Sequence, residues 1–279
     1  MIANLNDVLY KALEGKYAVG AFNVYNYETI RAVIEAIKEN KTPAIIAFGE
    51  KYLVNMELKE IANLVRTMTL DMDLPVVLHL DHTKDIDTIK KAIDSGFTSV
   101  MYDGSHLSFE ENLANTKLVV EYAHKNNVTV EAELGSIALG SHSNEDEGVT
   151  NYTDPLQAKE FVEATKVDCL AVSIGTVHGM YKGEPNISVD RLKEIKALVN
   201  IPLVLHGGSG TPKDTVHECI KNGIAKINVN TEISRQVVGL FRSAIAKNEE
   251  VHYSQLSTKA VKIAKETIIE HMEMFKVYE

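Results

Sequence analysis

The sequence predicts an α/β fold, a (β/α)8 TIM barrel with extra terminal helices. Eight short β-branched or apolar runs recur along the chain, and helical patterns separate them. The length of 279 residues is close to the roughly 250 that one such barrel occupies. Neither a linker nor a low-complexity tract interrupts the chain. We therefore expect residues 1–279 to form a single domain.

The eight expected strands are short apolar runs that end in polar or glycine-containing clusters. They are Ala18–Phe22, Ala44–Phe48, Val76–Leu80, Ser99–Tyr102, Thr129–Glu133, Cys169–Ser173, Leu203–His206 and Lys226–Val229. Because helical segments separate consecutive strands, each strand should return parallel to the previous one through a crossover. Eight such units favour a closed barrel over an open doubly wound sheet.

Amphipathic segments with helical spacing lie between these strands. They include Tyr27–Asn40, Ile86–Ser95, Phe109–Asn126, Pro155–Thr165, Val189–Val199 and Thr215–Asn222. Additional helices are expected at Leu5–Glu14, before the first strand, and at Ser257–Met274, after a helix that starts near Glu232. Only the connection Gly135–Tyr152 is too long for a bare turn, so we expect it to be a mobile loop on the functional face.

Composition and charge narrow the class of partner. The formal net charge of −10 argues against nucleic acid, whose binding needs clustered Lys and Arg, and favours a small-molecule ligand. No apolar stretch approaches the ~18 residues of a membrane span, and no leader-like segment opens the sequence, so a cytoplasmic protein without a membrane partner is expected. Cys169 and Cys219 lack metal-motif spacing and are expected to be buried structural residues.

The carboxyl ends of the expected strands carry many polar side chains, and barrel enzymes build their active sites there. His82, His178 and His206 follow the third, sixth and seventh strands and can converge above the barrel. Three imidazoles with an open fourth position are typical of a catalytic zinc site. A lone histidine at a strand end is more often structural, but three beside glycine-rich loops favour the metal. His79 is expected to be structural, because strand alternation places it deeper in the barrel.

Two loops favour a phosphate site. Gly207–Gly210 follows the seventh strand and Asn228–Thr231 the eighth, where barrels commonly hold phosphate with backbone N–H groups and a helix amino terminus. A glycine-rich run can also be a plain tight turn. Its position after the seventh strand favours phosphate binding over that alternative.

Seven short sequence strings are spread over almost the entire chain. They are AFNVYN, HLDH, DGSHLSFEEN, VEAELG, GTVHGMYKGEPN, LHGGSG and KINVNTE. Together they resemble the class II ketose-bisphosphate aldolase family. The resemblance implies a Zn2+ ion on His82, His178 and His206, with Asp81 as the acid/base group at the C4 hydroxyl of the substrate. It also implies that dihydroxyacetone phosphate is held by Gly179, Gly207, Gly208, Ser209, Asn228, Val229, Asn230 and Thr231.

The family resemblance carries further expectations. Asp103 and Glu133 hold a second metal or support the first site, and a monovalent cation (Na+ or K+) binds carbonyls around Gly179 and Gly207. A loop carboxylate exchanges a proton on dihydroxyacetone phosphate, with Glu145 preferred over Asp146 and Glu147. The family is usually dimeric or tetrameric, so a homodimer or homotetramer is expected.

Alternatives remain open at this stage. A divalent ion can stabilise the enediolate that aldol cleavage leaves. The other way to stabilise this intermediate is a lysine that forms a Schiff base, but no lysine stands at the carboxyl end of an expected strand. Asp81 would have a purely structural role if it only orients His82. The rival functions are another metal-dependent sugar-phosphate epimerase or isomerase, and a non-catalytic partner subunit. The intact set of His82, His178, His206 and Asp81 argues against the second.

The far end of the substrate is where this sequence departs from fructose-bisphosphate-cleaving relatives, which often have a Ser after strand two and an Arg in the last helix. This chain has Phe48-Gly49-Glu50 at the end of the second strand. Near the position of the Arg it has only lysines, Lys259, Lys262 and Lys265. Asn230 resembles fructose-bisphosphate enzymes more than the tagatose branch, which leaves the C4 stereochemistry open. We expect other ketose 1-phosphates, or a sugar with a different acidic end, to rival fructose 1,6-bisphosphate.

Overall fold

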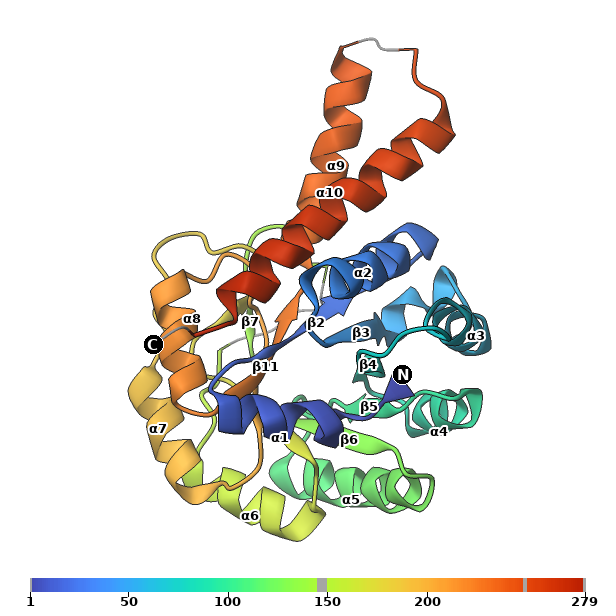
Figure 1. Ribbon diagram of the computed structural model, residues 1–279. Helices are drawn as coiled ribbons and strands as arrows, with labels where there is room; N and C mark the ends of the chain where they lie inside the picture. The colour runs from blue at the N-terminus through green and yellow to red at the C-terminus, as the bar shows by residue number, and fades with distance from the viewer. Residues whose placement is uncertain (1, 145–149, 248–249, 278–279) are drawn as a thin grey trace.

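The computed structural model describes residues 2–144, 150–247 and 250–277, and its centre is a closed eight-stranded parallel barrel (Figure 1). Each barrel strand pairs in parallel with two neighbours in the ring, and the pairing of β11 with β2 and of β4 with β5 leaves the ring without an open edge. The short strand β1 Ile2–Ala3 pairs with β4 in addition. The barrel strands are β2 Val19–Asn23, β3 Ala44–Gly49, β4 Val76–Thr83, β5 Ser99–Tyr102, β6 Thr129–Leu134, β8 Cys169–Val172, β10 Leu203–Leu205 and β11 Ile224–Val229. The fold class predicted from sequence is confirmed.

Helices surround the barrel (Figure 1). They are α1 Leu5–Gly15, α2 Tyr27–Asn40, α3 Leu58–Met68, α4 Ile86–Ser95, α5 Phe109–Lys125, α6 Pro155–Thr165, α7 Val189–Leu198, α8 Lys213–Lys221, α9 Thr231–Ala246 and α10 Tyr253–Met274. The last two extend away from the barrel as an arm, and α10 also packs along α2. Among the described residues, no helix has the length and apolar content needed to cross a membrane.

Two expectations about element boundaries are corrected. The last helix begins at Tyr253, four residues before the expected Ser257, because His252 caps it by accepting from the Ser254 backbone N–H. The segment Gly135–Tyr152 is not the only long connection, since residues 173–188 between β8 and α7 are also long. Short strands within these two connections, β7 Ala138–Leu139 and β9 Val177–His178, pair with each other, so the loops support one another.

Alternation along the strands divides the apolar side chains between two cores. In β3, Ile46 and Phe48 face the layer between the barrel and its outer helices, whereas Ile45 and Ala47 face the barrel interior. Helix α1 completes the interior core, where its buried residue Leu9 belongs to the same apolar cluster. The two cysteines are buried free thiols as expected, Cys169 in the inner core and Cys219 in the outer one.

Candidate active site

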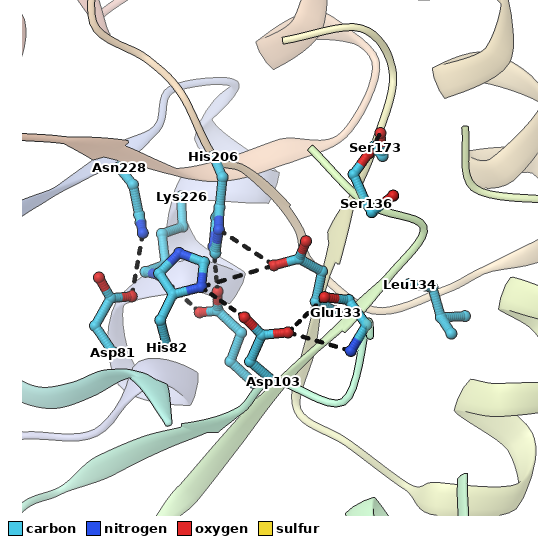
Figure 2. A network of polar contacts seen from close by, with 12 residues as sticks. Asp81, His82, Asp103, Glu133, Leu134, Ser136, Ser173, His206, Lys226 and Asn228 are labelled. Carbon is cyan, nitrogen blue, oxygen red and sulfur yellow. Dashed lines mark hydrogen bonds and ion pairs between the residues drawn. The ribbon is translucent and has the colours of Figure 1, made fainter. Parts of the chain in front are cut away.

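The barrel interior changes from apolar to charged toward the carboxyl ends of the strands (Figure 2). On β4, β6 and β11, ionisable side chains occupy the inward-facing positions near the carboxyl ends, and they are fully or almost fully buried. They are His79, Asp81, Glu131, Glu133 and Lys226. Because buried charges are costly unless they are paired, each of these groups needs an identified partner.

His82 is placed by an irregularity in β4. The register with β5 shifts between Leu80 and Thr83, and His82 adopts a left-handed φ of 44°, which is uncommon for a residue with a side chain. Such bulges re-aim side chains near functional sites. The His82 ring thereby meets Asp103, with 3.0 Å between Nδ1 and Oδ2 (Figure 2).

The structure brings the three predicted histidines together. One ring nitrogen from each of His82, His178 and His206 lies within 4.8 Å of the others. Nε2 of His178 and Nδ1 of His206 are buried and have no hydrogen-bond partner among the described residues. Burial lowers the pKa of both imidazoles, which favours the neutral form that binds metals. These observations fit a metal ion held by three nitrogen ligands.

His206 is oriented by a buried ion pair that sequence reasoning missed (Figure 2). Its Nε2 lies 2.8 Å from Glu131 Oε1, and Lys226 Nζ donates to Glu131 Oε2 at 2.7 Å. All three side chains are inaccessible to solvent. Burial raises the pKa of Glu131, but the charge of Lys226, the hydrogen bond with His206 and the charges of His79 and His206 together outweigh it and hold that pKa below its usual range. An ionised Glu131 accepts the Nε2 proton of His206 and leaves Nδ1 facing the other imidazoles.

A bulge explains why Lys226 was not foreseen. Leu203 and Val204 of β10 pair with Ile224 and Lys226 of β11, so Ala225 is an extra residue between the pairs. Ala225 belongs to the inner core, and strict alternation would then point Lys226 outward. Lys226 does not line the described part of the pocket, which argues against a Schiff-base role.

His79 lies deep in the barrel, as its strand position predicts. It is fully buried, and its Nδ1 lies 2.7 Å from Ser99 Oγ. Its Nε2 lies 3.7 Å from both Asp81 Oδ1 and Glu131 Oε2. Burial, helped by Lys226, lowers its pKa to about 4, so His79 is neutral at pH 7.

Asp81 is held by two amides at the floor of the pocket. Asn23 Nδ2 donates to one carboxylate oxygen at 2.9 Å. Asn228 Nδ2 donates to the other at 3.2 Å (Figure 2). Burial raises the pKa of Asp81, but the charges of His82, Lys226, His79 and His206 together outweigh it and leave that pKa below its usual range. Asp103 makes a contact that orients His82. Asp81 is therefore an ionised carboxylate in a fixed orientation in the described pocket.

Asp103 and Glu133 lie on the other side of His82. Asp103 accepts hydrogen bonds from Ser105 in addition to its contact with His82. Glu133 Oε2 lies 3.5 Å from His206 Nδ1 and has no hydrogen-bond partner among the described residues. Burial, reinforced by the charge of Asp103, raises the pKa of Glu133 well above its ordinary value. His82, Asp103 and Glu133 also form a second cluster that could hold a metal ion.

The pocket above these groups includes most of the predicted substrate-binding residues. Its described lining is Asn23, Asp81, His82, Ser143, Asn144, His178, Gly179, Gly207, Ser209, Asn228, Asn230 and Thr231. Asn23, Ser143 and Asn144 were not assigned from sequence, although Asn23 stands at a strand's carboxyl end, where polar residues are informative. Glu145, Asp146 and Glu147, the expected loop bases, lie outside the described residues.

Two predicted substrate-binding residues do not line the pocket. The N–H of Gly208 donates to the Asn228 carbonyl at 2.9 Å, and the side chain of Val229 packs in the outer core. A Cβ on Gly207 would lie 2.2 Å from the Val177 carbonyl oxygen, and Gly207 has a φ of 73°. Close backbone approach therefore accounts for part of this glycine-rich turn. Only the backbone of Val229 is left to face a ligand.

The residues named for the far end of the substrate lie elsewhere. Lys265 Nζ is 2.6 Å from Glu39 Oε2, and Glu50 Oε2 accepts from the Lys84 backbone N–H at 3.0 Å. The described lining contains none of Phe48, Gly49, Glu50, Lys259, Lys262 and Lys265.

Comparison with known proteins decides the family. The family model for class-II fructose-bisphosphate aldolase matches residues 3–279. The chain belongs to the class II fructose-bisphosphate aldolase family. Aldolases are lyases, and the family is generally metal-dependent, which agrees with the histidine cluster. This membership confirms the resemblance carried by the seven sequence strings.

Similar proteins within this family have different names. A fructose-bisphosphate aldolase from Geobacillus stearothermophilus is 43% identical over 256 residues, which are 90% of this chain and 88% of that protein. A 6-phospho-5-dehydro-2-deoxy-D-gluconate aldolase from Halalkalibacterium halodurans is 38% identical over 99% of this chain and 96% of its own length. The crystal structure of the YdjI aldolase from Escherichia coli K12 superposes with a TM-score of 0.89 at 34% identity, covering 99% of this chain and 97% of that one.

Proposed function

We propose that this protein is a zinc-dependent aldolase. It reversibly cleaves a ketose 1,6-bisphosphate of the fructose or tagatose type, or a related ketose 1-phosphate, to dihydroxyacetone phosphate and an aldehyde. One observation carries the proposal: His82, His178 and His206 converge from three separate segments beside the fixed carboxylate of Asp81, and Nε2 of His178 and Nδ1 of His206 are buried without a hydrogen-bond partner among the described residues. An epimerase or isomerase could share such a metal site, but the family membership favours aldol cleavage.

Asp81 performs the proton transfer in this proposal. In cleavage, its carboxylate accepts the proton of the C4 hydroxyl as the C3–C4 bond breaks. C4 becomes the aldehyde carbon, and the electron pair of the broken bond stays on the ketone half as an enediolate. The amides of Asn23 and Asn228 fix both carboxylate oxygens, so the base is oriented before the substrate arrives.

The residues that would hold zinc are His82, His178 and His206. When bound, the ion polarises the substrate carbonyl and stabilises the negative charge that develops on the ketone half. Glu131 and Asp103 keep two of the imidazoles in a fixed orientation, because Glu131 accepts a hydrogen bond from Nε2 of His206 and Asp103 accepts one from Nδ1 of His82. We propose that Asp103 and Glu133 support this site or hold a second metal.

The phosphate of dihydroxyacetone phosphate is proposed to bind where α9 begins. Gly179, Gly207, Ser209 and Thr231 line this part of the pocket, and the amino terminus of α9 favours an anion. A monovalent cation, Na+ or K+, is proposed beside the carbonyls of Gly179 and Gly207. Glu145 is proposed as the loop base that exchanges the proton at C3 of dihydroxyacetone phosphate.

We further propose a single-domain cytoplasmic protein that forms a homodimer or homotetramer and has no nucleic-acid or membrane partner. Its acidic composition supports the absence of a nucleic-acid partner. The helical arm of α9 and α10 extends away from the barrel and offers a surface for a second copy (Figure 1).

The decisive experiment is a cleavage screen of phosphorylated ketoses, with metal content measured on the same sample. We expect release of dihydroxyacetone phosphate, one zinc ion per chain, and loss of activity on chelation with recovery on zinc addition. Active protein that contains no divalent metal and is indifferent to chelators would overturn the zinc assignment. Turnover of the sugar without release of dihydroxyacetone phosphate would instead support the epimerase or isomerase alternative.

A further inference from the structure

Lys51 lies beside the carboxyl end of the barrel, just after β3, the strand that neighbours β4 and its Asp81. Gly49, the last residue of β3, pairs in register with Asp81 of β4. Lys51 follows two residues later, in the short 3-10 helix η1 Glu50–Val54. The turn that leaves β3 therefore brings a cation to the level of the proposed acid/base group.

The ammonium of Lys51 contacts a residue that lines the pocket. Nζ donates to the carbonyl oxygen of Asn144 at 3.3 Å and to its side-chain oxygen at 3.2 Å. Nζ also lies 5.3 Å from the centroid of the Tyr52 ring, within range of a cation–π attraction. These contacts hold Lys51 at the rim, one residue behind the pocket wall.

A buried tyrosine joins the polar groups of this rim. The hydroxyl of Tyr52 accepts from Asn144 Nδ2 at 2.9 Å and from Asn230 Nδ2 at 3.0 Å, and Tyr52 is only 7% exposed. Asn is a favoured helix cap, yet Asn230 does not cap α9 with its side chain and turns toward Tyr52 instead. We call Lys51, Tyr52, Asn144 and Asn230 the rim cluster.

The described pocket lining contains no Lys or Arg. Among the lysines named above for the distal end, Lys265 pairs with Glu39 and Lys262 lies 3.8 Å from Glu266 on α10. Lys51, in contrast, contacts Asn144, a residue of the described pocket wall. Its ammonium is a point charge with three rotatable donors, so it can bind either a carboxylate or a phosphate without the fixed geometry that a guanidinium requires.

We propose that Lys51 determines specificity for the aldehyde half by binding an anionic group, a carboxylate or a phosphate, at the end of that half away from the reacting carbon. The proposal rests on the aldolase function proposed above. Asn144 and Asn230 supply neutral polar groups beside the ammonium, and Tyr52 fixes both amides. Dihydroxyacetone phosphate remains assigned to the loops after β10 and β11.

The test measures condensation of dihydroxyacetone phosphate with three aldehydes of equal carbon number. Glyceraldehyde is neutral, glyceraldehyde 3-phosphate carries a phosphate, and tartronate semialdehyde carries a carboxylate. The zinc-loaded variants are Lys51→Met, which keeps the apolar stem, and Lys51→Arg, which keeps the charge. Lys59→Met, on the outer helix α3, is the matched control.

Lys51→Met is expected to lower kcat/KM about 10- to 100-fold for at least one anionic aldehyde, the effect of losing a hydrogen bond to a charged group. Glyceraldehyde should change less than about threefold, and Lys51→Arg should recover part of the loss. The aldehyde that loses most identifies carboxylate or phosphate as the recognised group. Equal losses for all three aldehydes, or a raised KM for dihydroxyacetone phosphate alone, would overturn the inference and leave the aldolase standing. Absence of condensation with every aldehyde would overturn both.

Discussion

Replacing Lys226 with Met tests the buried ion pair under the histidine cluster. Lys226 Nζ lies 2.7 Å from Glu131 Oε2, and both side chains are 0% exposed. At an effective dielectric constant of about 20, two unit charges at this separation attract by about 6 kcal/mol, before desolvation is subtracted. Removing one partner of such a pair typically costs about 3–5 kcal/mol, because the other charge stays buried. We expect a loss of that size in the free energy of unfolding.

The measurement is urea unfolding followed by circular dichroism, with chelator present throughout so that metal binding does not contribute. The double variant Lys226→Met/Glu131→Gln should be more stable than the single variant Lys226→Met by about 1 kcal/mol or more, because it no longer contains the buried carboxylate of Glu131. Lys221→Met is the control: Lys221 lies 3.3 Å from Glu218 with both side chains 51% exposed, so a change within about 1 kcal/mol is expected.

Two outcomes would refute this reasoning. A loss below about 1 kcal/mol in Lys226→Met would mean that the pair contributes no more than an exposed one. A double variant no more stable than Lys226→Met would mean that the destabilisation does not come from an uncompensated charge on Glu131. Either result would remove the basis for assigning Lys226 to the support of His206.

Three further predictions address the proton-transfer group, the zinc support and the pH dependence of stability. Asp81→Asn should lower kcat by about 10²- to 10⁴-fold with zinc retained, as zinc analysis and cleavage assays can check, and an equal loss of zinc would contradict this. Glu131→Gln should weaken zinc binding about 10- to 100-fold in competition with a chelator, whereas unchanged affinity would show that His206 needs no such partner. Burial lowers the pKa of His271, but its 2.8 Å contact with Glu232, together with the Thr267 carbonyl and the charge of Glu270, outweighs this and raises that pKa above 6.5. The pair therefore stabilises the fold fully below pH 6.5, as long as Glu232 is ionised, and stabilises it less as the pH rises through the raised pKa of His271. The difference in the free energy of unfolding between the wild-type protein and His271→Gln should shrink between about pH 6 and 9. A constant difference would refute the assignment.

The barrel could be predicted from sequence because each strand is an apolar run that alternates between two buried faces. Val76–Leu80 and Ser99–Tyr102 have no other way to bury both faces than between a packed interior and outer helices. The two-residue strands β7 Ala138–Leu139 and β9 Val177–His178 have no such signal. Their pairing depends on two loops that are far apart in the sequence.

The histidine cluster could be predicted because position along a barrel strand already places a residue near the pocket. Lys226 could not, since one extra residue, Ala225, changes which face the following side chains occupy. Tyr52 and Asn144 were missed for a different reason. Their contact joins segments 92 residues apart, and neither segment carries a local pattern that points to the other.

The charges in the barrel give an independent argument for a divalent ion. Four buried carboxylates, Asp81, Asp103, Glu131 and Glu133, lie around the histidine cluster, and Lys226 is the one buried ammonium among the described residues there. With neutral imidazoles and ionised carboxylates the balance is four negative charges against one positive, and burial together with the charge of Asp103 raises the pKa of Glu133. A doubly charged cation in the same place would offset this excess of negative charge. It would also lower the repulsion that an acidic pocket exerts on a phosphorylated sugar, so a divalent ion would reconcile the acidic cluster with an anionic substrate.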